Sequence, residues 1–551
     1  NAARDRLFQF EIWRRQSTGT VAEILGPSEL KRDIGTRLFM FRGDIVDEMN
    51  HYHPRGQKII TAFVDGVNAY IDLVNSKPEN LPIEFKMLGI KPQKWTPEVV
   101  ISRHQGLLGN IGQELDIARQ VAMMGTDRIH DLNYFHPKEP LLALDSTINK
   151  DWLKQDILEL YNAYRRTVEF DEQDLIAAIN NSESSDIGYN ELQDDSPDFN
   201  IGSNNWVVSG KHTKSGYPIM ANDPHRRQSV PSLRYMCHLI APGWDVIGGG
   251  EPEIPGISIG HNEYGAWGLT VFRTDAEDLY IYRLNPKNKN EYWHMDQWNE
   301  FDSIVTVIPV KGAKEHRAVL KYSIHGPVVY TINEEDVAFA VRCGWMEIGG
   351  APYLASLRMN QSKNFEEFRA ACNYSNIPGE NMIWADKAGN IGWQSVGIAP
   401  IRRNFSGMVP VPGDGRYEWD GYLPIIEKPN VYNPPSGIFI TANENVTPSD
   451  YSEWDAIGYS WADAFRGDRL HNILSSGKKF SVLDMAELQT DYKSVPATQL
   501  IPLLKGLESE DQVVQKYIDL LLEWRTFKLE VESIEAAIYV EWEANLKEEF
   551  E

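Results

Sequence analysis

Ser203 has the surroundings that most directly suggest chemistry in this chain of 551 residues. It stands in the segment Gly202-Ser-Asn-Asn-Trp206, directly after a polar, acidic stretch (180–200) with the composition of a linker or an exposed loop. If the Gly202–Ser203 bond were cut, Ser203 would gain a free α-amine, whose pKa of about 7.7–8.0 lies near ambient pH. Such an amine can activate its own hydroxyl as a nucleophile. Local composition does not establish the cut, and a linker that runs into a strand is the alternative.

Two other serine patterns compete with this interpretation. Gly256-Ile-Ser258-Ile-Gly260 matches G-x-S-x-G, which needs a strand before the serine and a helix after it. Glycines and β-type residues follow in 261–268, so a chance match is favoured, although a serine hydrolase that uses Ser258 stays open. In serine β-lactamases the S-x-x-K pattern comes before the other conserved elements of the active site along the chain. Here Ser475–Lys478 comes after the segments that resemble those elements, so we reject this match.

Three carboxylates, those of Asp275, Glu277 and Asp278, lie close together after a predicted strand. Carboxylates crowded in this way repel each other unless a cation lies among them, and hard oxygen ligands suit Ca²⁺. The alternative is a solvated acidic turn, and the spacing alone favours that alternative.

Composition excludes several classes of partner. Lys plus Arg is 54 and Asp plus Glu is 79, so the net charge is 54 − 79 = −25. This argues against nucleic acid and against an anionic membrane surface as partners. No run approaches the roughly 18 apolar residues of a membrane span. The three cysteines form no C-x-x-C pair and are too few for a disulfide framework.

The elements that must position these residues change along the chain. Apolar residues recur at helical spacing over 59–71, and a second helix is predicted over 151–168. Short β-type runs follow Gly202 and continue to about residue 445, beginning with paired strands near 206–208 and 218–222; helical patterns return from Ser481. The order of helices, spacer, many strands and helices predicts an α+β fold.

Several motifs, in order along the chain, resemble those of the penicillin acylase (penicillin amidase) family of N-terminal nucleophile hydrolases. They include Asp5–Arg15, Gly19–Gly26, Ser203–Trp206, Gly260–Asn262, Pro410–Gly413, Ala442–Asn445 and Asp463–Arg466. The resemblance implies an αββα sandwich of antiparallel sheets flanked by helices. It also implies a helical α-subunit-like region (1–170), an excised spacer (171–202) and a β-subunit-like catalytic region (203–551). The two chains would form an αβ heterodimer after processing, and we expect the sequence to be a fragment of a longer protein.

The resemblance also implies roles for individual residues. Ser203 would be the nucleophile, the Asn445 side chain and the Val271 N–H the oxyanion hole, and His225 and Arg466 neighbours of the active site. One structural Ca²⁺ would be bound by Glu114, Asp275, Glu277, Asp278, Gly407 and Asp455, with Glu277 and Gly407 contributing backbone carbonyls.

The implied activity is hydrolysis of a small-molecule acyl amide through an acyl-enzyme on Ser203. Arg226, Ile259, Leu269 and Ser356 stand where penicillin G acylases carry aromatic residues, so an acyl-homoserine-lactone or cephalosporin-type acylase is an alternative. An uncleaved, inactive binding relative is an alternative of another class. The family resemblance further implies a periplasmic or secreted protein.

Overall fold

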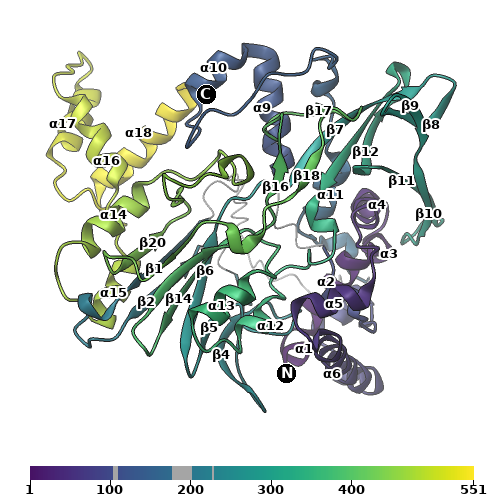
Figure 1. Cartoon of the computed structure of the whole chain (residues 1–551), viewed down its shortest axis with the longest axis horizontal. Coiled ribbons are helices and arrows are strands. Elements are labelled where there is room, and N and C mark those ends of the chain that lie inside the picture. The colour runs from purple at the N-terminus through teal and green to yellow at the C-terminus, as the bar shows by residue number, and fades with distance from the viewer. Residues whose placement is uncertain (104–109, 177–201, 226–228, 551) are drawn as a thin grey trace.

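Two antiparallel sheets pack face to face at the centre of an α+β fold (Figure 1). The computed structural model describes residues 1–103, 110–176, 202–225 and 229–550. One sheet has the order β2-β1-β20 and the other β19-β15-β14-β6-β5-β4-β3. Helices α14 and α15 cover the first sheet, and α12 and α13 lie on the second. The helix–sheet–sheet–helix layers confirm the predicted αββα sandwich.

The strands of these two sheets all lie after residue 202. Those of the smaller sheet are β1 (Ser203–Val208), β2 (Ile219–Pro224) and β20 (Ile438–Thr441). Those of the larger sheet are β3 (Tyr235–Ala241), β4 (Trp244–Gly250), β5 (Ile259–Asn262), β6 (Gly265–Val271), β14 (Glu380–Asp386), β15 (Ile391–Ser395) and β19 (Asn430–Tyr432). The flanking helices are α12 (Ser356–Met359), α13 (Phe365–Cys372), α14 (Phe465–Leu474) and α15 (Val482–Gln489). The predicted pairing near 206–208 is the β1–β2 ladder, in which Trp206 faces Ala221.

A third sheet extends from the sandwich through the connection between β6 and β7. It has the order β10-β11-β12-β13-β7-β8-β9, and β17 pairs with β7. Its strands are β7 (Glu277–Asn285), β8 (Asn288–His294), β9 (Gln297–Glu300), β10 (Asp302–Ile308), β11 (His316–Ser323), β12 (Gly326–Ile332), β13 (Val337–Cys343) and β17 (Val411–Pro412). A two-stranded sheet of β16 (Pro400–Arg402) and β18 (Trp419–Tyr422) lies beside it.

The described part of the chain before Ser203 forms helices and no strands. They are α1 (Ala2–Asp5), α2 (Leu7–Thr18), α3 (Ala22–Leu25), α4 (Leu30–Leu38), α5 (Ile45–Tyr52), α6 (Gly56–Ser76), α7 (Ile83–Leu88), α8 (Pro97–Val100), α9 (Asn110–Met124), α10 (Thr126–Leu132) and α11 (Glu159–Arg165). The C-terminal helices are α16 (Val495–Leu500), α17 (Gln512–Glu523) and α18 (Ile534–Phe550). None of the described helices combines the length and apolar content needed to cross a lipid bilayer.

Helix α6 confirms the helix predicted over 59–71, but the helix predicted over 151–168 is shorter. Only α11 is an α-helix there, preceded by a 3-10 turn at Trp152–Lys154. Arg119 donates to the carbonyls of Leu153 (2.8 Å) and Gln155 (3.0 Å). Gln155 has an extended backbone, with ψ of 160°, which interrupts the helical pattern, and Arg119 supplies donors to the carbonyls at this break.

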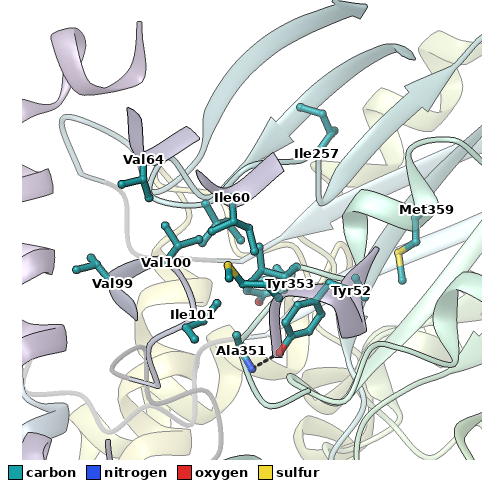
Figure 2. Packing of buried hydrophobic residues seen from close by; sticks show 14 of the residues in the cluster. Tyr52, Ile60, Val64, Val99, Val100, Ile101, Ile257, Ala351, Tyr353 and Met359 are labelled. Atoms are coloured by element: carbon teal, nitrogen blue, oxygen red, sulfur yellow. Dashed lines mark hydrogen bonds between the residues drawn. The ribbon is translucent and has the colours of Figure 1, made fainter. Parts of the chain in front are cut away.

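The helices before residue 103 pack on the strand-rich region through a shared core. Figure 2 shows Ile60 of α6 and Tyr52 of α5 near Tyr353, and Val64 and Ile257 belong to the same cluster. Ile60 and Val64 lie four residues apart, on one face of the helix. The Tyr52 hydroxyl accepts a hydrogen bond from the Ala351 N–H at 2.7 Å, which satisfies a polar group inside this core.

Candidate active site

Ser203 is the first residue of β1, the middle strand of the smaller sheet. It is buried, with 3% of its surface exposed. Strand β1 packs against β6, and this contact brings the start of β1 to the end of β6 at Val271. The sandwich therefore fixes both residues by regular structure and not by a loop.

Two N–H groups point at the Ser203 hydroxyl oxygen. The Val271 backbone N–H donates to Oγ at 3.3 Å, and the Asn443 side-chain amide donates to it from Nδ2 at 3.2 Å. Paired donors of this kind can stabilise negative charge that develops on an oxygen beside the nucleophile. The structure places Val271 where the resemblance implied.

Asn443 is held in one orientation by its carbonyl end. Its Oδ1 accepts from the Ser203 N–H at 2.7 Å and from Arg466 Nη2 at 2.9 Å. Arg466 Nη1 also donates to the Ser203 carbonyl (3.1 Å) and to Asn204 Oδ1 (2.7 Å). Because Oδ1 faces two donors, Nδ2 must face the Ser203 hydroxyl. Arg466 thus lies where it was expected, next to the nucleophile.

The structure does not bring Asn445 to Ser203, so the sequence-based placement in this motif was wrong by two residues. Asn445 Nδ2 contacts His136 Nδ1 at 2.8 Å, and its Oδ1 accepts from the Thr447 N–H at 3.0 Å. Asn443 has a left-handed backbone with φ of 72°, which asparagine tolerates better than most residues. This turn directs its side chain at Ser203.

Strand register is the signal that could have identified Asn443. In the β1–β20 ladder, Asn205 lies opposite Thr441. Extending this antiparallel register by two residues places Asn443 opposite Ser203. The motif Ala442-Asn-Glu-Asn445 offers two asparagines, and only the pairing of β20 with β1 distinguishes them.

His225 lies beside the site but does not touch the hydroxyl of Ser203. Its backbone N–H donates to the Gly202 carbonyl at 2.8 Å. Its ring Nε2 lies 3.2 Å from Asn204 Nδ2 and 3.3 Å from Asp223 Oδ2. His225 therefore contacts both neighbours of Ser203. Arg226 lies outside the described residues.

The structure does not support Ser258 as a nucleophile. Strand β5 follows it directly, where the elbow pattern needs a helix. Its buried hydroxyl donates to Glu251 Oε2 at 2.6 Å, and its N–H donates to the Gly249 carbonyl. This serine ties two strands together.

Three of the predicted calcium ligands gather around a buried arginine. Arg402 donates from Nε to Asp278 Oδ2 at 2.8 Å, and its Nη2 lies 3.3 Å from Asp275 Oδ1. Glu114 of α9 accepts the Leu279 N–H at 3.1 Å. We call Glu114, Asp275 and Asp278 the acidic cluster. Burial, followed by the charges of Asp278 and Asp275, raises the pKa of Glu114.

Two further predicted ligands approach the acidic cluster through their backbones. The Glu277 carbonyl accepts from Arg402 Nη2 at 3.2 Å, whereas its carboxylate accepts from Tyr161 and Trp345. A Cβ atom on Gly407 would lie 2.7 Å from Asp275 Oδ2, so this glycine lies directly against the cluster. Glu277 and Gly407 thus lie beside the acidic cluster, and their roles as carbonyl ligands stay a prediction.

Asp455 is engaged elsewhere. Its carboxylate pairs with Lys138 Nζ at 2.7 Å and accepts from the Tyr459 hydroxyl at 2.6 Å. Burial opposes its ionisation, but these two bonds lower its pKa. Across residues 1–103, 110–176, 202–225 and 229–550, no three His, Cys, Asp or Glu side chains form a ready-made metal site.

The charge of the acidic cluster nevertheless fits a divalent cation. One guanidinium faces three carboxylates, so full ionisation of all three would leave two negative charges uncompensated by Arg402. Asp278 Oδ1 is buried and has no hydrogen-bond donor. Burial is the main effect that raises the pKa of Asp275 to about 7, although Arg402 opposes it. A dication would supply the missing charge and the missing partner.

Comparison with known proteins extends the resemblance to the whole chain. The family model described as penicillin amidase matches residues 1–551. The chain is 28% identical over 541 residues to penicillin G acylase of Escherichia coli, which covers 92% of this chain and 63% of that protein. It is 26% identical over 520 residues to the acyl-homoserine lactone acylase QuiP of Pseudomonas aeruginosa, with 90% and 58% covered.

A solved structure supports the fold. A thermostable penicillin G acylase from Alcaligenes faecalis superimposes with a TM-score of 0.53 at 27% sequence identity, covering 59% of each chain. The chain spans about three fifths of the length of the curated relatives it matches.

Proposed function

Because the chain belongs to the penicillin amidase family, we propose that the protein hydrolyses an acyl amide with Ser203 as its nucleophile. The observation that carries this proposal is the convergence of the Val271 N–H and the Asn443 amide on Ser203 Oγ. In this mechanism Ser203 Oγ attacks the substrate carbonyl and its own α-amine takes the proton. The two donors stabilise the tetrahedral oxyanion, the amine product leaves, and water hydrolyses the acyl-enzyme.

The α-amine requires cleavage of the Gly202–Ser203 bond, which we propose is autocatalytic. Ser203 Oγ would attack the Gly202 carbonyl carbon, the C–N bond would break, and the hydroxyl proton would pass to the released amine. Water would then hydrolyse the ester. The His225 N–H, at 2.8 Å from the Gly202 carbonyl oxygen, supports this step because it can stabilise charge on that oxygen.

The site is already arranged for the amine that cleavage would release. The Ser203 nitrogen lies 2.7 Å from Asn443 Oδ1, so an amine there keeps a hydrogen-bond acceptor. Processing would yield an αβ heterodimer of the regions on either side of 171–202. As in the family resemblance, we place the protein in the periplasm or outside the cell.

For the acyl group, we propose a chain other than phenylacetyl. Ile259, Leu269 and Ser356 stand at the acyl-pocket positions in place of aromatic rings, and Leu269 and Ile259 belong to the same apolar cluster. An acyl-homoserine lactone or a cephalosporin-type amide is therefore the alternative to a penicillin as substrate, and its hydrolysis belongs to the same reaction class. Rates on phenylacetyl, octanoyl and glutaryl p-nitroanilides would rank these groups, and a clear preference for phenylacetyl would contradict the proposal.

We also propose that a structural Ca²⁺ is bound by the acidic cluster with the carbonyls of Glu277 and Gly407. The cation would supply charge compensation to α9 and the β6–β7 connection and take no part in the reaction. Asp455 would join only after leaving Lys138. Elemental analysis of dialysed protein should find one calcium per chain, with a lower Tm after chelation. No bound calcium and an unchanged Tm would refute the site.

Covalent labelling tests the assignment of the nucleophile. Phenylmethylsulfonyl fluoride should modify Ser203, which peptide mapping after digestion would locate. Modification of Ser258 would favour the alternative hydrolase. An intact Gly202–Ser203 bond after long incubation, together with no labelling, would favour an inactive binding relative.

A further inference from the structure

A buried lysine lies against the backbone that carries Val271. Lys428 is fully buried, with none of its surface exposed. Its Nζ contacts Thr274 Oγ1 at 3.2 Å and the carbonyls of Val396 and Gly397, each at 3.0 Å. All three partners are neutral oxygens. A buried amine held in this way costs stability, so its contacts need an explanation.

The three partners of Lys428 belong to two connections that meet beside Val271. Thr274 follows the end of β6 by three residues, and Val396 and Gly397 follow the end of β15. A Cβ atom on Gly397 would lie 2.6 Å from Gly379 Cα, which shows how closely the second connection approaches β14.

The segment that follows β6 is also hydrogen-bonded to the chain at the start of β14. The Phe272 N–H donates to the Gly379 carbonyl at 3.0 Å, and the next residue, Glu380, pairs with Val271 in the β6–β14 ladder. Lys428 Nζ also lies 4.9 Å from the centre of the Phe272 ring. The Lys428 amine thus lies near Phe272, the residue next to Val271. It also contacts both chain segments, the one that leaves β6 and the one that leaves β15.

Both protonation states of the amine keep the three polar contacts. An ammonium has three N–H donors for three oxygens. A neutral amine can donate to the two carbonyls and accept from the Thr274 hydroxyl, which can serve as donor or acceptor. Burial lowers the pKa of Lys428 to about 7, so both forms exist near neutral pH. The contacts do not depend on which form is present.

We propose that Lys428 is a positioning residue for the oxyanion-stabilising N–H of Val271. By binding Thr274 together with Val396 and Gly397, it holds the backbone that follows β6 in one conformation. Val271 is the last residue of β6, so the direction of its N–H toward Ser203 Oγ depends on that conformation. This inference rests on the proposed function, because it concerns the transition state of the Ser203 reaction.

Lys428→Met tests the inference, because it keeps an unbranched side chain only one atom shorter and removes all three contacts. Complete loss of an oxyanion donor costs roughly 100- to 1000-fold in rate, so a misaligned donor should lower kcat on the order of tenfold. KM should stay within about twofold, because the ground-state carbonyl carries no full charge. The substrate is the p-nitroanilide that the wild type hydrolyses fastest.

Gln394→Met is the matched control. Gln394 is also buried and donates to the carbonyls of Ser395 and Ile425 and, at 3.5 Å, to the backbone carbonyl of Lys428. It therefore supports the same backbone as Lys428, but none of its hydrogen bonds reaches 272–274. It should lower Tm with kcat within about twofold of wild type. Thr274→Val removes one of the three contacts at nearly constant volume and should lower kcat by a smaller factor than Lys428→Met. If Lys428→Met does not fold, Thr274→Val alone decides the inference.

The outcomes separate this inference from the proposed function. A folded Lys428→Met, or Thr274→Val in its place, with wild-type kcat would overturn the positioning role while leaving Ser203 as nucleophile. An equal fall of kcat in Gln394→Met would overturn it too, because loosening of the region would then suffice. If the wild-type chain neither hydrolyses amides nor reacts with phenylmethylsulfonyl fluoride, the proposed function fails and the inference falls with it.

Discussion

The Asn443 side chain contacts Ser203 with both ends of its amide. Nδ2 donates to the serine Oγ at 3.2 Å, and Oδ1 accepts from the serine nitrogen at 2.7 Å. One residue therefore contacts both the oxygen that we propose as the nucleophile and the nitrogen that would become its base. We assign the oxyanion role to Asn443 and expect its neighbour Asn445 to be dispensable for the reaction.

Asn443→Gly should lower kcat by roughly 100- to 1000-fold, by loss of one preorganised donor. Glycine suits the test because φ at this position is 72°, which alanine would adopt only with strain. Asn445→Ala is the control: it removes the contacts to His136 and the Thr447 N–H, so Tm should fall while kcat changes little. Steady-state kinetics on the folded variants would show this, and equal kcat losses in both would contradict the assignment.

Arg466→Met should reduce kcat by about tenfold through the orientation of Asn443. Without the Nη2 donor, Oδ1 keeps only the Ser203 nitrogen as partner, and the amide is held less firmly, by Ser203 and the Val271 carbonyl. Arg466→Lys should restore only part of the activity, because a single ammonium cannot match the fork of a guanidinium. A kcat of wild-type size in Arg466→Met, on protein with a normal thermal melt, would speak against this orienting role.

Gly202→Ala should slow cleavage of the Gly202–Ser203 bond. A Cβ atom here would lie 2.9 Å from Asn443 Oδ1 and 3.0 Å from Arg466 Nη2, closer than such contacts normally allow. Gly66→Ala, where a Cβ atom meets nothing within 4 Å, is the control. The fraction of intact chain over time, read on a denaturing gel, should rise only for Gly202→Ala. Identical time courses for the two variants would remove the steric argument.

The buried Lys428 should make stability depend on pH in a defined direction. Its pKa is about 7 in the folded protein and about 10.4 when exposed, so between these values the unfolded chain binds more protons. The free energy of unfolding should therefore gain from this group as pH rises through that window, by about 1.4 kcal/mol per pH unit. Below pH 7 both states are protonated and the contribution stays flat.

Chemical denaturation of wild type and Lys428→Met between pH 6 and pH 10 would measure this slope. The difference between the two unfolding free energies should move in favour of the wild type as pH rises. A pH-independent difference would mean that Lys428 keeps an ordinary pKa in the folded protein.

The sequence predicted the order of elements and singled out Ser203 because these depend on local patterns. The 3.6-residue spacing of Ile60, Val64 and Val67 and the motif around Ser203 are visible without knowledge of contacts. The contact between Asn443 and Ser203 was missed because it depends on the register between β1 and β20, strands separated by more than 200 residues. Long-range pairing of this kind leaves no periodic signal in either segment.

The same reason limited two other sequence-based predictions. The helix expected over 151–168 is interrupted at Gln155, whose backbone is extended, and Arg119 from a different helix binds the carbonyls there. The sequence singled out Asp275, Glu277 and Asp278 as crowded carboxylates. It did not indicate the guanidinium of Arg402 between them, because Arg402 comes from a strand more than 120 residues later. Lys428 has no local motif at all, and only the fold brings it to Thr274.

An intact mass spectrum of the purified, active protein decides whether Ser203 acts as an N-terminal nucleophile. It should show two chains, one of which begins at Ser203, and a mass increase on that chain after reaction with phenylmethylsulfonyl fluoride. A single uncleaved chain in a preparation that hydrolyses amides would refute this role, because Ser203 would then have no α-amine to act as its base.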